Sequence, residues 1–178
     1  MLCYLLIVHL LIPIPMYTIR DAGTADAESI CYIAEQAWWE AAGPISDKQN
    51  LQVMLEDIYS SENISHQIKS GIQHYLLLIE CEMTVGFAAY SPEVDLPGIY
   101  KLHKLYCLPN TQGKGFVKIL IREVISKVAE AGKHRLELNV NRLGNTKDFY
   151  EKMGFHLIEE QKSWSTGTQT NMIMYLEF

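Results

Sequence analysis

Hydrophobic and polar positions along the chain change their spacing in a way that predicts strands and helices in turn. The run Tyr100–Leu108 predicts a strand, which a Pro-Asn pair ends. Phe116–Ala131 has the spacing of an amphipathic helix, and a glycine follows its last residue. Arg135–Val140 alternates as a second strand. These segments predict a parallel strand–helix–strand unit with the right-handed crossover that such units adopt.

The rest of the chain shows the same two kinds of pattern. Further strands are expected at Tyr17–Arg20, His74–Glu80, Thr84–Tyr90, Phe155–Glu160 and Met172–Glu177. Helices are expected at Ala27–Trp39, from the Ser46-Asp47 cap through Ile58, at Asn63–Ser70 and at Asn145–Met153. The pattern therefore predicts a mixed α/β fold, with a twisted sheet of about seven strands and about four helices around it.

A glycine-containing loop lies between the central strand and its helix. Its sequence is Gln112-Gly113-Lys114-Gly115, and it leads directly into the helix start. Backbone N–H groups at such a point converge on an anion, and the helix dipole adds about half a positive charge. The spacings of a Walker loop and of a dinucleotide-binding loop are both absent. The loop is thus a candidate phosphate site, although many such turns only connect two elements.

The segment Asn145–Phe155, with sequence NTKDFYEKMGF, completes a longer pattern. With the loop, it resembles the GNAT superfamily of acetyl-CoA-dependent N-acetyltransferases. In that family a Gln/Arg-x-x-Gly-x-Gly/Ala loop binds the CoA pyrophosphate, and a Phe-Tyr-Glu-Lys-x-Gly-Phe helix follows. Counted from Gln112, Gly115 fits the pattern, whereas Val117 stands where the family has a second small residue. Valine still offers its backbone N–H, so we expect binding to survive.

The resemblance also implies how the cofactor is held. Residues 112–117 would offer N–H groups to the pyrophosphate, either of two lysines would add positive charge, and the end of the central strand would pair with pantetheine. The cofactor-binding residues expected on this basis are Leu105, Tyr106, Cys107, Gln112, Gly113, Lys114, Gly115, Phe116, Val117, Lys118, Asn139, Asn145 and Lys152.

Two residues are candidates for acid–base catalysis. Tyr150 matches the family tyrosine that faces the CoA sulfur, so the resemblance assigns it as proton donor to the thiolate; a packed aromatic is the alternative. His103 is a candidate base because the pKa of histidine suits the task. Strand alternation places it on the side of Leu105 and Cys107, opposite Tyr106, and leaves open which of the two sides faces the acceptor. Glu93 and Asp95 are alternatives in a nearby loop. Direct transfer, as in the family, makes Cys107 a structural thiol.

Three aromatic residues of the first helices are candidate contacts for the acceptor. In the family these helices form the acceptor-side wall, which makes Trp38, Trp39 and Tyr59 candidates. Packing in the core or a place on the surface is the more common role for such residues.

Composition narrows the partners. The chain of 178 residues has a formal net charge of −6, which disfavours nucleic acid and anionic membranes and favours cationic substrates. The four cysteines are scattered, which indicates free thiols in a reducing compartment, the cytoplasm, and no metal site. Met1–Pro15 is apolar but shorter than the span of about 20 residues that a membrane helix needs. We interpret it as an extension ahead of a single domain over residues 16–178; a hydrophobic anchor is the alternative.

These observations predict an acetyl-CoA-dependent N-acetyltransferase that acts on a primary amine of a small molecule by direct transfer. The segment beginning Lys101-Leu-His-Lys-Leu-Tyr, with the later Asn139-Val-Asn-Arg run, resembles bacterial polyamine (spermidine/spermine) acetyltransferases. A protein N-terminus and an aminoglycoside are alternative acceptors, and a non-catalytic acyl-CoA-binding regulator is an alternative function. A homodimer is left open.

Overall fold

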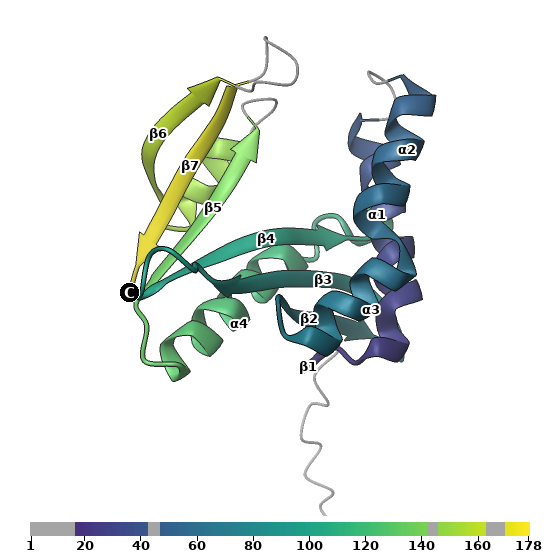
Figure 1. Cartoon of the computed structure of the whole chain (residues 1–178), viewed down its shortest axis with the longest axis horizontal. Coiled ribbons are helices and arrows are strands. Elements are labelled where there is room, and N and C mark those ends of the chain that lie inside the picture. Colours follow the sequence, from purple (N-terminus) through teal and green to yellow (C-terminus); the bar gives the residue numbers. More distant parts are fainter. Residues whose placement is uncertain (1–16, 43–46, 142–145, 163–169) are drawn as a thin grey trace, which may run out of the picture.

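The computed structural model describes residues 17–42, 47–141, 146–162 and 170–178 (Figure 1). The expected extension at residues 1–15 and the candidate Asn145 lie outside these described residues.

The described strands form one sheet of seven strands in the order β1-β2-β3-β4-β5-β7-β6. Neighbouring strands run antiparallel, except that β4 and β5 are parallel. The expected parallel pair is thereby confirmed. The strands are β1 (Tyr17–Asp21), β2 (His74–Glu80), β3 (Met83–Pro92), β4 (Ile99–Cys107), β5 (Arg135–Asn141), β6 (His156–Lys162) and β7 (Thr170–Glu177).

Helices cover both faces of this sheet, which confirms the mixed α/β architecture. They begin where capping residues predict: Asp47 accepts hydrogen bonds from the N–H groups of Gln49 and Asn50, and Ser60 caps the next helix. The described helices are α1 (Ala27–Ala42), α2 (Lys48–Tyr59), α3 (Ser61–Ser70), α4 (Phe116–Glu130) and α5 (Thr146–Lys152), with short 3-10 turns at Thr24–Asp26 and Pro109–Thr111. None of them is long and apolar enough to cross a membrane.

Two apolar clusters fill the space between the sheet and its helices. On one face, α4 and α5 pack on the sheet through residues such as Leu120 and Phe155. On the other face, α1, α2 and α3 pack through residues such as Ile33 and Phe87. The inner strands are buried on both faces, which explains why β2 is a continuous apolar run and not an alternating one.

The sheet opens between its two parallel strands. Pairing runs from Ile99 opposite Arg135 to Leu102 opposite Leu138, and both strands continue beyond the last pair. Figure 1 shows β5, β6 and β7 diverging from β4 along this stretch. The backbone of the second half of β4 therefore has no strand partner on its β5 side among the described residues.

Candidate active site

The end of β4 presents free backbone edges to the opening in the sheet. Leu105, Tyr106 and Cys107 lie beyond the last pair with β5, so their outward N–H and C=O groups are available to an extended ligand. Gly86 of β3 lies directly beside this segment. A side chain at that position would come within 2.6 Å of the Cys107 sulfur and 3.1 Å of the Tyr106 carbonyl oxygen. The glycine therefore lets the two strands approach closely where the cleft begins.

The turn after β4 forms an anion-binding geometry. Gly113 and Gly115 have φ angles of 82° and 77°, in the left-handed region that favours glycine. Gly115 is the N-cap of α4 and has no side chain with which to cap it. The first N–H groups of a helix have no partner within the helix, so here they stay available to a ligand. A Cβ atom on either glycine would meet no protein atom within 4 Å, which means that both face open space.

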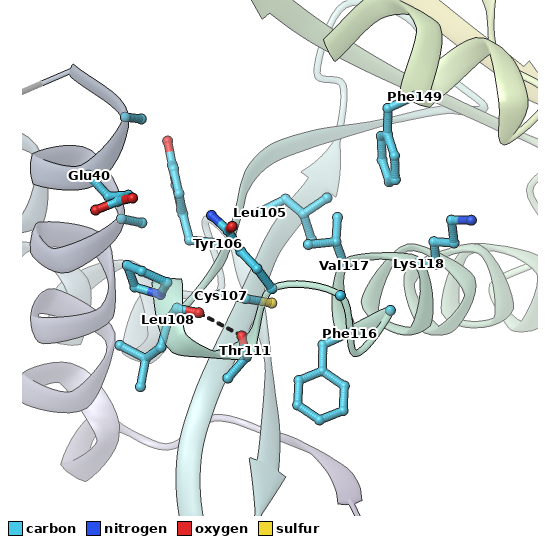
Figure 2. A pocket seen from close by; sticks show the side chains of 16 residues that line it. Glu40, Leu105, Tyr106, Cys107, Leu108, Thr111, Phe116, Val117, Lys118 and Phe149 are labelled. Atoms are coloured by element: carbon cyan, nitrogen blue, oxygen red, sulfur yellow. Dashed lines mark hydrogen bonds between the residues drawn. The ribbon is translucent and has the colours of Figure 1, made fainter. Parts of the chain in front are cut away.

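A cavity of about 780 Å³ joins these two features. Figure 2 shows Glu40 and Tyr106 on the α1 side of this cavity, and Val117, Lys118 and Phe149 on the opposite side. The hydroxyl of Thr111 donates a hydrogen bond of 2.6 Å to the Leu108 carbonyl, which fixes the turn between strand and helix. The lining residues are Ala37, Glu40, Ala41, Leu105, Tyr106, Cys107, Leu108, Pro109, Thr111, Gln112, Gly113, Gly115, Phe116, Val117, Lys118 and Phe149.

The two lysines of the loop have different surroundings. Lys114 donates hydrogen bonds of 2.8 and 2.7 Å to the carboxylate of Glu80, so its charge is neutralised at the surface. Lys118 lies on the first turn of α4, exposed, and lines the cavity. Val117 also lines it, half-buried against the core cluster of α4. The arrangement therefore offers the charge of Lys118, and not that of Lys114, to an anion in the cavity.

A smaller cavity of about 310 Å³ lies next to the first and shares four of its residues, Ala37, Ala41, Leu105 and Tyr106. It is bounded by α1, by β4 and β5 where these strands separate, and by α5. Its remaining lining residues are Trp38, Leu102, His103, Lys104, Leu138, Asn139, Val140, Thr146 and Tyr150. Two connected cavities on either side of Leu105 and Tyr106 can hold a donor and an acceptor in one ternary complex.

Tyr150 is held at the boundary of the two cavities. Its side chain is 9% exposed and lines the smaller cavity, while its neighbour Phe149 lines the larger one. Edge-on contacts with Phe149 and Phe155, at 5.2 and 5.5 Å between ring centroids, fix its ring. Burial, and then the nearby Tyr106, raise the pKa of Tyr150 to about 12. The phenol is therefore protonated at physiological pH, as a hydrogen donor must be.

His103 occupies an irregular position in β4. The register with β3 shifts so that Ala89 faces Lys104 while Tyr90 faces Leu102, which leaves His103 as the extra residue of a β-bulge. The alternation that would place His103 on the face of Leu105 is broken, and Leu102 takes that place in the core. His103 Nε2 lies 2.8 Å from the hydroxyl oxygen of Ser91.

The electrostatics of this strand keep His103 neutral. Burial, and then the charges of Lys104 and Lys101, lower the pKa of His103 to about 4, against the opposing effect of Glu93. Lys104 itself is 8% exposed, and its hydrogen-bond partners in the described part of the chain include no carboxylate. Its ammonium donates to three neutral oxygens, on Gln67, Gln73 and Tyr75, and burial lowers its pKa to about 8.

The structure sorts the residues predicted from the sequence into three groups. The predicted cofactor residues from Leu105 to Lys118 line the large cavity, except Lys114. His103, Asn139 and Tyr150 line the smaller one. Lys152 lines neither of these two cavities and is exposed on α5.

Sequence reasoning expected the first helices on the acceptor side and named Trp38, which lines the smaller cavity, but it missed the other residues of α1 that line the cavities. Ala37, Glu40 and Ala41 come from one face of that helix, at the i, i+3, i+4 spacing. Two alanines on that face leave room for a ligand, and this small-residue spacing was the signal available in the sequence.

Comparison with known proteins identifies the family. A family model described as the acetyltransferase (GNAT) domain matches residues 42–176. The chain belongs to this GNAT family. A curated relative, the [ribosomal protein bS18]-alanine N-acetyltransferase of Haemophilus influenzae, is 30% identical over 103 residues, which are 56% of this chain and 68% of the relative.

Solved GNAT structures share the fold. The PaiA N-acetyltransferase of Thermoplasma acidophilum, in complex with coenzyme A, has a TM-score of 0.77 at 20% identity, covering 91% of this chain and 99% of the other. The ribosomal-protein-S18-alanine N-acetyltransferase of Escherichia coli has a TM-score of 0.70 at 18% identity, covering 91% and 94%. YncA of Salmonella typhimurium, solved with acetyl-CoA, has the same TM-score at 19% identity, covering 91% and 94%.

Family membership confirms the activity class expected from the sequence. This GNAT protein is an acetyl-CoA-dependent N-acetyltransferase, and acetyl-CoA is its co-substrate. The finer resemblance to polyamine acetyltransferases receives no support from these comparisons, because the curated relative has a ribosomal protein as its acceptor.

Proposed function

We propose that the chain transfers the acetyl group of acetyl-CoA to the amino terminus of a protein or peptide. One observation carries this choice: no described residue that lines the smaller, acceptor-side cavity is a carboxylate, and Glu40, which lines the large cavity, is the one carboxylate among the described lining residues of the two. Such a cavity suits an acceptor with a single amino group that reacts in its neutral form. A polyamine would bring several positive charges close to Lys104, and no further acid among these lining residues would balance them.

The relatives agree with this acceptor class. Both the Haemophilus influenzae and the Escherichia coli proteins are named for acetylation of an alanine of ribosomal protein S18. A peptide terminus also suits the chemistry, because an α-amino group has a pKa of roughly 8, against roughly 10.4 for an alkyl amine. A larger share of it is therefore the neutral nucleophile at physiological pH.

In the proposed reaction the free edge of β4 and the start of α4 hold acetyl-CoA across the large cavity. Leu105 and Cys107 offer backbone groups to pantetheine, while the N–H groups of Gly115 and Val117 and the charge of Lys118 face the pyrophosphate. Gln112, Gly113 and Phe116 complete this wall. The predicted cofactor residue Asn139 lies on the acceptor side, so we assign it to the acceptor. Lys114, Asn145 and Lys152 have no assigned part in this binding scheme.

The chemical step then proceeds from the acceptor side. The neutral amine attacks the thioester carbon, and a backbone N–H near Tyr106 donates a hydrogen bond to the oxygen that becomes negative. The carbon–sulfur bond breaks as Tyr150 gives its proton to the sulfur. The proton lost by the amine goes to His103, directly or through water, and returns to the Tyr150 phenolate through solvent. No covalent intermediate on Cys107 is needed, and burial raises the pKa of that thiol to about 12.

An acceptor panel tests the proposal. CoA release is measured with a peptide that begins with alanine, with the same peptide blocked at its amino terminus, and with spermidine. We expect turnover of the free peptide alone, with kcat/KM rising with pH around a midpoint of roughly 8, the pKa of an α-amino group. The assignment would be contradicted if spermidine is acetylated and the free peptide is not, or if the blocked peptide reacts at the same rate as the free one.

A further inference from the structure

Three aromatic side chains from distant parts of the sequence meet at the wall shared by the two cavities. They are Trp38 of α1, Tyr59 at the end of α2 and Tyr106 of β4. Tyr59 meets Tyr106 edge-on at 6.0 Å between ring centroids, and Trp38 lies 6.4 Å from it. Phe87 packs beside the Tyr106 ring at 5.6 Å. Figure 2 shows the Tyr106 ring standing between β4 and α1.

The polar atoms of this cluster are two hydroxyl groups and one indole N–H. Tyr59 donates its hydroxyl proton to the Tyr106 oxygen across 3.2 Å. The buried indole N–H of Trp38 has no hydrogen-bond partner in the described chain. A hydroxyl has one proton, and an indole nitrogen only donates. Since Tyr106 accepts from Tyr59, its own proton is not used in that bond and must point elsewhere.

The open space around Tyr106 defines where that proton can go. Tyr106 lines both cavities, and Trp38 lines the acceptor-side one. Burial raises the pKa of Tyr106, although the hydrogen bond from Tyr59 and the proximity of Trp38 lower it in part. The hydroxyl therefore keeps its proton and acts as a donor, not as a base.

We propose that the Tyr106 hydroxyl, held by Tyr59, donates a hydrogen bond to a carbonyl oxygen next to the acceptor amine. This inference rests on the proposed function, because the first residue of a peptide carries such a carbonyl beside its amino group. Tyr106 becomes a specificity-determining residue, and Tyr59 a positioning residue. An acceptor without the carbonyl leaves the donor unpaired, which disfavours its binding.

Two acceptors of similar shape separate this role from a structural one. Alaninamide has the carbonyl, whereas sec-butylamine has a similar branched carbon skeleton without it. For each acceptor, KM is measured in wild type and variant. Where sec-butylamine turns over too slowly to follow, its Ki as a competitive inhibitor of alaninamide acetylation is measured instead. Comparing each variant with wild type within one acceptor removes the difference between the two amine pKa values.

We expect Tyr106→Phe to raise KM for alaninamide by roughly tenfold, the value of one hydrogen bond, and to leave sec-butylamine within about twofold. Tyr59→Phe should shift KM in the same direction by less, since the Tyr106 hydroxyl stays but is no longer held. Tyr32→Phe, on an exposed tyrosine of α1 (56% exposed), is the control and should change neither value. Calorimetric affinity for acetyl-CoA should stay the same in all three variants.

The outcomes distinguish this inference from the proposed function. Equal losses for both acceptors in Tyr106→Phe would overturn the carbonyl assignment alone, since Tyr106 would then act on the thioester or on packing. A wild-type enzyme that acetylates sec-butylamine but not alaninamide would overturn the proposed peptide acceptor and the Tyr106 assignment together. If Tyr106→Phe does not fold, Tyr59→Phe decides through the same pair of acceptors.

Discussion

The two halves of the cleft are built in different ways. The cofactor half comes from one continuous stretch, β4, the glycine turn and the start of α4, and it presents mainly backbone groups. The acceptor half draws side chains from α1, the middle of β4, β5 and α5. A backbone site needs local geometry and depends little on the side chains around it, so we expect it to tolerate Val117. A side-chain site changes with every residue that enters it, so the acceptor is the harder part to infer.

The largest expected effect lies where the two halves meet. Tyr150→Phe keeps the packed ring but removes the hydroxyl, so kcat should fall by roughly 10²–10⁴, the range for a lost general acid. KM for acetyl-CoA should hardly change, because the turn and β4 hold the cofactor. Steady-state kinetics with acetyl-CoA varied would reveal this. A near-normal kcat would show that the sulfur takes its proton from another group, and a raised KM alone would make Tyr150 a binding residue.

The second prediction tests the backbone half. Gly115→Val places a branched side chain on a left-handed residue that faces the cavity, where no protein atom lies within 4 Å of the new Cβ. We expect KM for acetyl-CoA to rise by roughly 10- to 100-fold, since strain of about 1–2 kcal/mol adds to blocked access. Gly71→Val, at a similar φ after α3, is the matched control for strain alone. If both variants change KM equally, the turn is not the phosphate site.

The two lysines beside that turn should differ in their effect on KM for acetyl-CoA, and both effects should be smaller than that of Gly115→Val. Lys118→Met should raise KM for acetyl-CoA several-fold, because the charge of Lys118 faces the cavity. The lost free energy should be at or below the roughly 1.5–3 kcal/mol of a hydrogen bond to a charged group. Lys114→Met should change KM by less than about twofold, since an exposed pair such as Lys114 with Glu80 contributes roughly 0–1 kcal/mol. Steady-state kinetics of each variant with acetyl-CoA varied measures both KM values. The reverse order would place the pyrophosphate nearer Lys114.

A modest effect is also expected at His103. A base must be neutral to accept a proton, and with a pKa of about 4 His103 is neutral at every higher pH. Its contribution should therefore be constant from pH 6 to 9 and decline only as pH falls toward 4. A base of such low pKa is weak, so His103→Gln should lower kcat/KM by roughly tenfold or less. A pH profile whose rising limb near pH 6.5 disappears in His103→Gln would show instead that the pKa of His103 is not lowered.

The pKa of Tyr150 determines what is expected on the alkaline side of the pH–rate profile. A general acid must be protonated, and a pKa of about 12 keeps Tyr150 protonated throughout the usual range. No descending limb below pH 10 is therefore expected in wild type. The acceptor amine alone should set the rising limb.

Sequence patterns identified the elements of this fold well because most signals are local. Asp47 at the start of α2, the glycine after α3, and the continuous apolar run of β2 each act over a few residues. That the predicted cofactor residues from Leu105 to Lys118, except Lys114, line one cavity follows for the same reason, since a strand, a turn and a helix start are consecutive in the chain. The bulge at His103 could not be, because a strand pattern does not show where its partner's register shifts.

The sequence by itself thus determined the strand–turn–helix that lines the large cavity, because its elements are consecutive in the chain. Only the tertiary structure decided that β4 and β5 separate after Leu102, that Glu80 neutralises Lys114, and that Trp38 and Tyr59 meet Tyr106. These are contacts between residues far apart in sequence. Their geometry follows from how helices and strands pack as whole bodies, which no local pattern encodes.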